Sequence, residues 1–162
     1  MNLIRTSLAA AVAAVCCASL AQAGTAGDDF QVSAEVIAAC SINASDLNFG
    51  DYNPVVGTAV DGSSTISVTC TNGAAYSIGL SAGASGNVAA RAMDHDTENA
   101  TLSYGLFSDA LREEIWGDVS DTVDGVGTGA NQNVTVYGRV FASQSTALVG
   151  SYADTITATV EF

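Results

Sequence analysis

The stretch FQVSAEVIAACSI, residues 30–42, carries the strongest structural signal in the sequence. Every even position from Phe30 to Ile42 is apolar, while Gln31, Ser33 and Glu35 are polar. A period of two is typical of a β-strand with one buried face. The run covers thirteen residues, whereas a strand usually has about five or six. The sequence therefore predicts a strand that is too long for one small domain.

A secretory signal precedes this stretch. Residues 1–23 combine one positive charge at Arg5, an apolar run from Leu8 to Leu20, and the ending Ala-Gln-Ala that signal peptidase accepts. The apolar run is too short to span a bilayer, so we expect cleavage before Gly24 and no membrane insertion. The expected organisation is a signal peptide (1–23), an N-terminal extension (24–37) and one domain (38–162).

The mature chain is strongly acidic. It keeps all 17 acidic residues of the sequence against three arginines and no lysine, a side-chain balance of 3 − 17 = −14. Such a surface repels nucleic acids and anionic lipids, so we expect neither as a partner. Only Cys40 and Cys70 remain after cleavage. Two cysteines in an oxidising compartment normally pair, which predicts a disulfide between them.

The rest of the mature chain consists of further alternating runs separated by turn-forming residues. The runs are STISVTC (64–70), AYSIGL (75–80), TLSYGLF (101–107), NVTVYGRVF (133–141) and YADTITATVEF (152–162). Clusters of Gly, Asn, Asp and Ser lie between them, and the one proline is Pro54. This pattern predicts an all-β fold, an immunoglobulin-like antiparallel β-sandwich.

The end of the chain raises a complementary problem. The last run stops at Phe162 in full alternation, which predicts an exposed hydrophobic strand edge. Such edges promote aggregation unless another strand covers them. The sequence thus has a surplus strand at the front and an uncovered edge at the back.

Candidate catalytic and metal sites are weak. GLSAG (79–83) matches the G-x-S-x-G nucleophile motif around Ser81, but no helix pattern follows it as that motif requires. The group Asp94, His95, Asp96 and Glu98 lacks metal-ligand spacing, and we expect it in a solvated loop. Asp118, Asp121 and Asp124 are three residues apart, whereas calcium loops place acids two apart. We therefore expect no enzyme activity, cofactor or metal.

Several motifs, taken in order, resemble the spore coat protein U domain family, the pilin domain of archaic, Csu-type chaperone–usher pili. They are CSINASDLNFGDYNP, SVTCTNGAAYSIGLSAG, LSYGLFSD followed by WG, VYGRV and the closing GSYADTITATVEF. The resemblance runs from about Phe30 to Phe162. It implies a sandwich that lacks its final strand, a groove first filled by a periplasmic chaperone, and later exchange at an outer-membrane usher for the extension of the next subunit.

The resemblance also implies roles for particular residues. Phe30, Val32, Ala34 and Val36 would be the donor side chains inserted into a neighbour. The acceptor groove would be bordered by the closing strand, with Ile156, Ala158, Val160 and Phe162. The implied product is a homopolymeric pilus exported through the periplasm to the cell surface, where it would support adhesion and biofilm formation.

Two other readings of the sequence stay open. The chain could be a self-complemented, monomeric secreted binding or coat module in which residues 30–38 fold back into their own groove. It could also be a small hydrolase that uses Ser81 and His95. The end of the donor segment is not fixed either, because the alternation continues through Val36, Ala38 and Cys40.

Overall fold

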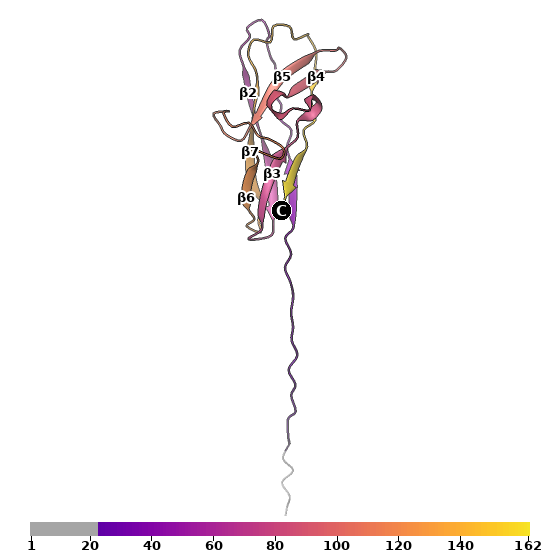
Figure 1. The fold of residues 1–162 in the computed structure, drawn as a ribbon, viewed down its shortest axis with the longest axis vertical. Helices are drawn as coiled ribbons and strands as arrows, with labels where there is room; N and C mark the ends of the chain where they lie inside the picture. The colour runs from indigo at the N-terminus through magenta and orange to yellow at the C-terminus, as the bar shows by residue number, and fades with distance from the viewer. Residues whose placement is uncertain (1–22) are drawn as a thin grey trace, which may run out of the picture. The chain divides into compact units, whose positions relative to one another are not determined.

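The computed structural model describes residues 23–162, so the predicted signal peptide lies, except for Ala23, outside the described residues. The chain divides into two units at residues 34 and 35. Residues 23–34 contain no helix or strand, whereas Glu35–Phe162 forms the β-domain. Figure 1 shows the strands of this domain.

The β-domain is built from antiparallel strands in two sheets. One sheet has the order β1-β2-β7-β5-β4-β8 and the other β6-β3-β9. The strands are β1 (Cys40–Ala44), β2 (Val60–Cys70), β3 (Ala75–Leu80), β4 (Ala92–His95), β5 (Thr101–Phe107), β6 (Val123–Val126), β7 (Gln132–Val140), β8 (Tyr152–Ala153) and β9 (Ala158–Glu161). The expected all-β sandwich is confirmed.

One hydrophobic core joins the two sheets, and its side chains come from the alternating runs. The longest pairing is between β2 and β7, where every second residue from Ile66 to Cys70 is buried. Trp116 is fully buried and its indole N–H donates to the carbonyl of Ile78 at 2.8 Å. The buried apolar residues of the core are Ile66, Val68, Cys70, Tyr76, Ile78, Leu80, Leu102, Tyr104, Leu106, Trp116, Val136 and Val140.

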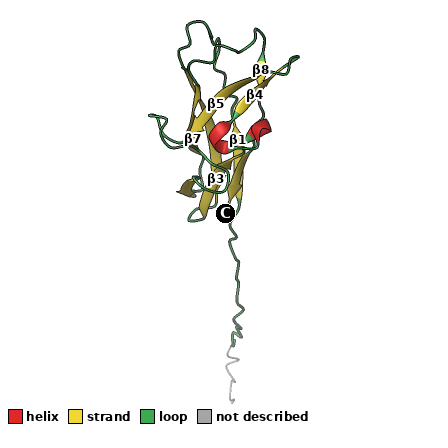
Figure 2. Ribbon diagram, turned by 45° about the horizontal axis from the view of Figure 1, so that its top comes forward, coloured by secondary structure: helices red, strands yellow, loops and turns green. Residues whose placement is uncertain are grey.

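Two short 3₁₀ helices, η1 (Gly83–Ser85) and η2 (Val88–Ala90), connect β3 to β4 and are red in Figure 2. Neither has the length or apolar character of a membrane span, and no other helix occurs within residues 23–162.

Segment 44–54, which follows β1, packs across the larger sheet because two glycines make room for it. Gly62 and Gly138 are register partners on β2 and β7. A Cβ on Gly138 would come within 2.8 Å of the Phe49 ring and 2.9 Å of Leu47, and one on Gly62 within 3.1 Å of Phe49. Larger residues would therefore push Phe49 and Leu47 off the sheet.

The structure corrects three sequence-based expectations. The closing run 152–162 is not one strand, since β8 pairs with β4 and β9 pairs with β3, so the chain changes sheet between them. The cluster DGVGTGANQN (124–133), expected to form only turns, overlaps β6, which pairs with β3. His95 ends β4 and is buried instead of lying in a solvated loop. In each case pairing with a distant strand overrides the local pattern.

Candidate strand-binding cleft

A cleft of about 1110 Å³ opens between two segments of the β-domain. Segment 44–54 forms one wall and segment 147–158 forms the other. The floor is apolar and is made of core side chains from both sheets. They are Ile66, Leu80, Met93, Leu102, Tyr104, Leu106, Val136 and Val140.

The two walls continue the outermost strands of the two sheets. β1 is the first strand of the larger sheet and β9 the last strand of the smaller one, and the two strands lie side by side (Figure 1). The N–H of Ser81 donates to the carbonyl of Thr157, and Gly79 pairs with Thr159. Because antiparallel pairing alternates, the backbone groups of Ala158 and Val160 point away from β3, toward the open edge.

The same alternation applies to β1. The N–H of Thr71 donates to the carbonyl of Ala39, and the N–H of Ser45 donates to the carbonyl of Thr65. The intervening residues Cys40, Ile42 and Ala44 therefore turn their backbone groups away from β2. Two open strand edges thus border the same part of the domain, which is the arrangement that an added strand requires.

One wall of the cleft is held to the floor by Asp154. The hydroxyl of Tyr104 on β5 donates to Oδ2 of Asp154 at 2.7 Å, while the N–H groups of Ala84 and Thr155 donate to Oδ1. Burial raises the pKa of Tyr104 well above its ordinary value, and the hydrogen bond to Asp154 raises it further. Tyr104 is therefore a neutral donor throughout the physiological range.

His95 holds a second point on that wall. Its Nδ1 accepts hydrogen bonds from the N–H groups of Thr97 and Glu98 and lies 3.1 Å from Oδ1 of Asp96, while Nε2 lies 3.1 Å from the carbonyl oxygen of Val149. The ring also meets Tyr152 edge to face, with centroids 4.9 Å apart. These contacts fix segment 149–152, which lines the cleft.

Arg91 is fully buried beneath the same region. Its guanidinium donates to the carbonyls of Ser81, Val88, Leu80 and Trp116 at 2.8–3.2 Å. Burial lowers the pKa of Arg91, and the nearby Tyr104, Asp154 and Asp118 oppose that change. The arginine thereby links the end of β3 to the backbone of the buried Trp116, so its role is structural.

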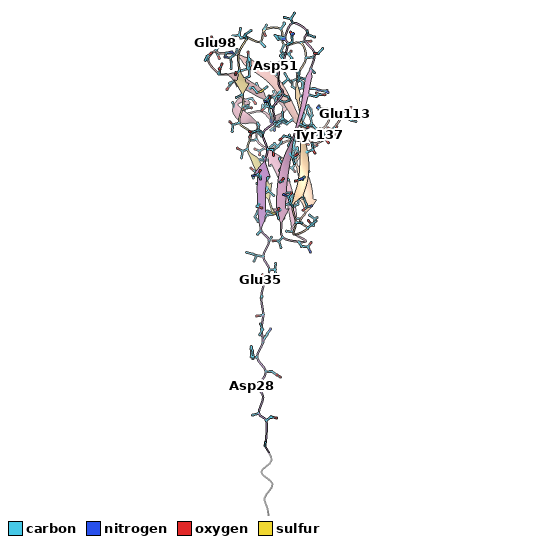
Figure 3. The ribbon with its side chains drawn as sticks, turned by 180° about the vertical axis from the view of Figure 1, so that it is seen from behind. Asp28, Glu35, Asp51, Glu98, Glu113 and Tyr137 are labelled. Atoms are coloured by element: carbon cyan, nitrogen blue, oxygen red, sulfur yellow. A yellow bond between two sulfur atoms is a disulfide. The ribbon has the colours of Figure 1, made fainter. Side chains whose placement is uncertain are left out.

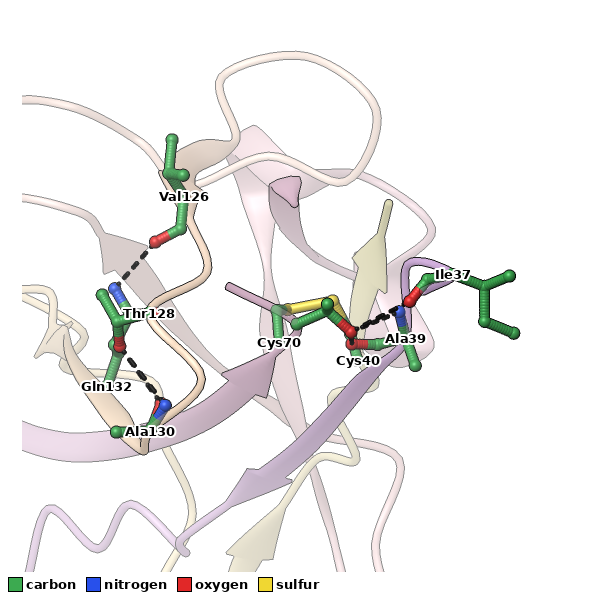
Figure 4. The surroundings of a disulfide bond; sticks show 9 residues. Ile37, Ala39, Cys40, Cys70, Val126, Thr128, Ala130 and Gln132 are labelled. Carbon is green, nitrogen blue, oxygen red and sulfur yellow. Dashed lines mark hydrogen bonds between the residues drawn. A yellow bond between two sulfur atoms is a disulfide. The ribbon is translucent and has the colours of Figure 1, made fainter. Parts of the chain in front are cut away.

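The predicted disulfide is confirmed, because Cys40 and Cys70 are bonded and are also register partners on β1 and β2. Thr71 extends this connection toward the N-terminus. Its Oγ1 accepts from the N–H of Ala39 at 3.1 Å and lies 3.2 Å from the carbonyl of Ile37. Ile37 and Ala39 lie beside the disulfide in Figure 4. The β-domain therefore contacts its chain from Ile37 onward and pairs with it in the ladder from Cys40.

The four predicted donor residues lie in the part of the chain that forms no strand. Phe30, Val32 and Val36 are 86%, 83% and 84% exposed, and Ala34 is exposed as well. Three large apolar side chains exposed at alternate positions are costly in water. Their donor role remains a prediction.

Only two of the four residues predicted for the acceptor edge line the cleft. Ile156 and Ala158 line the cleft, and Val160 packs half-buried against the core. Phe162 is 60% exposed and is not among the lining residues. Sequence reasoning missed the opposite wall, 44–54, although the apolar and aromatic residues Leu47, Phe49 and Tyr52 in it were a usable signal.

The two catalytic candidates serve structural contacts. The Oγ of Ser81 accepts from the N–H of Thr157 at 2.9 Å, whereas the ring nitrogens of His95 contact Val149, Thr97 and Glu98. Within residues 23–162, no three His, Cys, Asp or Glu side chains converge as metal ligands would.

Comparison with known proteins identifies relatives. The family model of the Spore Coat Protein U domain matches residues 26–159. Protein U of Myxococcus xanthus is 37% identical over an alignment of 180 positions, which covers 100% of both chains.

A solved structure is similar as well. It is the crystal structure of the CsuC-CsuE chaperone-tip adhesion subunit pre-assembly complex from archaic chaperone-usher Csu pili of Acinetobacter baumannii. The match has a TM-score of 0.60 and 26% identity, and it covers 78% of the present chain. It spans 40% of the matched chain, so the similarity concerns less than half of that protein.

Proposed function

Because the chain belongs to the Spore Coat Protein U domain family, we propose that it is a structural subunit of a chaperone–usher surface pilus. Its cleft would receive a β-strand from another molecule, first from a periplasmic chaperone and then from residues 30–36 of a second copy. The subunit would be exported through the periplasm and assembled at an outer-membrane usher. It would act without catalysis, and the fibre would support adhesion and biofilm formation.

One observation carries this proposal: the same chain contains an apolar-floored cleft that continues from two open strand edges, and an exposed segment with the alternation of a strand. Backbone pairing along the open edges would supply affinity, and alternate side chains entering the cleft would set the register. Burying Phe30, Val32 and Val36 should contribute about 1.5–3 kcal/mol each. The similarity to a chaperone–subunit complex of Csu pili supports a chaperone as the first occupant.

The double variant Val32→Asp/Val36→Asp tests the donor role. It would place two carboxylates into an apolar cleft without partners, which is strongly unfavourable. The matched control is Gln31→Asp/Ser33→Asp, which adds the same charge at the alternate positions. With the chaperone coexpressed, both variants should yield soluble chaperone–subunit complexes. Only the control should then form heat-resistant multimers on electrophoresis, and multimers formed equally by both variants would contradict the donor assignment.

A further inference from the structure

The anchorage of the chain between Ile37 and Cys40 decides which molecule can receive its donor segment. We propose that this anchorage prevents residues 30–36 from entering the cleft of their own domain and so directs them to a second copy of the chain. The inference rests on the proposed function, since it concerns the occupant of the same cleft.

The anchorage has three parts on adjacent residues. The hydroxyl group of Thr71 contacts the backbone at Ile37 and Ala39, and the N–H of Thr71 donates to the carbonyl of Ala39 at 2.9 Å. Cys40 is then bonded to Cys70 and paired with it in the ladder. Residues 37–40 are thereby held along the edge of β2, and Figure 4 shows Ile37 and Ala39 beside the disulfide.

The position of the cleft makes this anchorage decisive. Its wall begins at Ala44 and runs to Pro54. A segment that folds back beside its own β1 must be antiparallel to it, so the two paired residue numbers have a constant sum. To place Val36 beside Ala44, the chain would have to reverse at Cys40, which the disulfide and the ladder hold in place.

A reversal before the anchored residues fails for a different reason. A two-residue turn at Glu35 and Val36 would pair Ala34 with Ile37 and would bring Phe30 only as far as Ser41. The donor side chains would then lie beside β1 and stop short of the cleft. The local sequence Val-Ile-Ala-Ala (36–39) also lacks the Gly, Asn or Asp that tight hairpin turns prefer.

A second copy avoids both difficulties, because its segment can approach the cleft from outside without any reversal of the chain. The seven steps from Ile37 to Ala44 span about 23 Å at about 3.3 Å per residue. A flexible insertion longer than this, placed just before Ile37, should therefore abolish the restriction. Fifteen Gly/Ser residues reach at most about 50 Å.

The test compares three full-length mature proteins: the natural chain, a chain with fifteen Gly/Ser residues between Val36 and Ile37, and a control with the same insertion between Gly27 and Asp28. A flexible tether gives an effective concentration in the mM range. At ~10 μM protein, the first insertion should therefore favour self-insertion about 100-fold over exchange. We expect heat-resistant multimers from the natural chain and the control, and a monomer from the Val36–Ile37 insertion.

Thermal unfolding distinguishes a monomer whose own segment fills its cleft from a monomer whose cleft stays empty. The monomer with the Val36–Ile37 insertion should unfold at a higher temperature than a chain lacking residues 24–37. Multimers from this variant in the same yield as from the control would overturn the inference, as would a monomer no more stable than the shortened chain. A natural chain that never forms multimers would instead overturn the proposed function, so the two failures are distinct.

Discussion

The hydroxyl group of Tyr104 donates a 2.7 Å hydrogen bond to the carboxylate of Asp154, and this bond joins the floor of the cleft to its wall. Tyr104 belongs to β5 of the larger sheet, whereas Asp154 lies where the chain crosses from β8 to β9. The contact therefore fixes the position at which the chain passes from the larger sheet to the smaller one, beside the cleft.

Tyr104→Phe should weaken this connection. A hydrogen bond to a charged group contributes about 1.5–3 kcal/mol, and the half-buried Asp154 places the expected loss at the lower end. The pKa of Tyr104 is raised in the folded state, so its stabilisation is complete below the ordinary tyrosine pKa of about 10 and is lost as the pH rises above it. Urea unfolding from pH 7 to 11 should show a steeper alkaline loss for the natural chain than for the variant. Parallel pH profiles would contradict this role.

Arg91→Met should destabilise the domain severely. It removes the donors to the buried carbonyls of Leu80 and Trp116, and each unsatisfied buried acceptor costs about 1–3 kcal/mol. The matched control is Arg139→Met, which breaks the exposed pair with Asp61 and should cost less than about 1 kcal/mol. Chemical denaturation of the two variant mature chains, each compared with the natural one, measures both. Equal losses for the two variants would show that Arg91 is not a structural centre.

The disulfide should stabilise the domain through its unfolded state. Cys40 and Cys70 are 30 positions apart, and closing a loop of this size is worth about 3–4 kcal/mol in the chain-entropy model. Cys40→Ala/Cys70→Ala should therefore lower the free energy of unfolding by this amount. Addition of a reductant should lower it for the natural chain but leave the variant unchanged. A natural chain insensitive to full reduction would refute the prediction.

Gly138→Ala and Gly62→Ala should both destabilise the domain, to different extents. The Cβ at position 138 would lie 2.8 Å from Phe49, while the one at position 62 would lie 3.1 Å away, so the first substitution should be the more harmful. Overpacking of this kind costs about 1–3 kcal/mol. Because Phe49 belongs to the cleft wall, binding of a peptide with sequence 28–38 should weaken in the same order, as measured by calorimetry. The reverse order would exclude this packing role.

Sequence patterns predict the strands whose alternation is set by one buried face. The runs AYSIGL and TLSYGLF coincide with β3 and β5, and the pairing of Cys40 with Cys70 follows from their being the two cysteines left after the predicted cleavage. The division of the last run into β8 and β9 was not predictable, since both strands keep the same apolar phase while they pair in different sheets.

The candidate site was predicted in outline only. The alternation of residues 30–36 identifies a segment that needs a partner. The position of the cleft could not be predicted, because it depends on which distant segments the topology brings together. Segment 44–54 has no regular period, because its apolar residues pack against glycines of β2 and β7 and not in a ladder. The buried position of Arg91 likewise depends on carbonyl groups from three separate segments.

The donor segment joins the β-domain at one end, and segment 44–54 of the cleft reaches toward the other. Glu35 lies at one end, where the chain enters the domain, and Asp51 and Glu98 lie at the other (Figure 3). A segment that serves a neighbour would therefore connect domains end to end, and its removal should stop chain growth without removing the fold.

Size-exclusion chromatography of the mature protein with and without residues 24–37 tests the central claim most directly. We predict heat-resistant multimers from the complete mature chain, and small or amorphously aggregating species from the shortened one. Two monomers of equal stability would contradict the claim that this segment completes a neighbouring subunit.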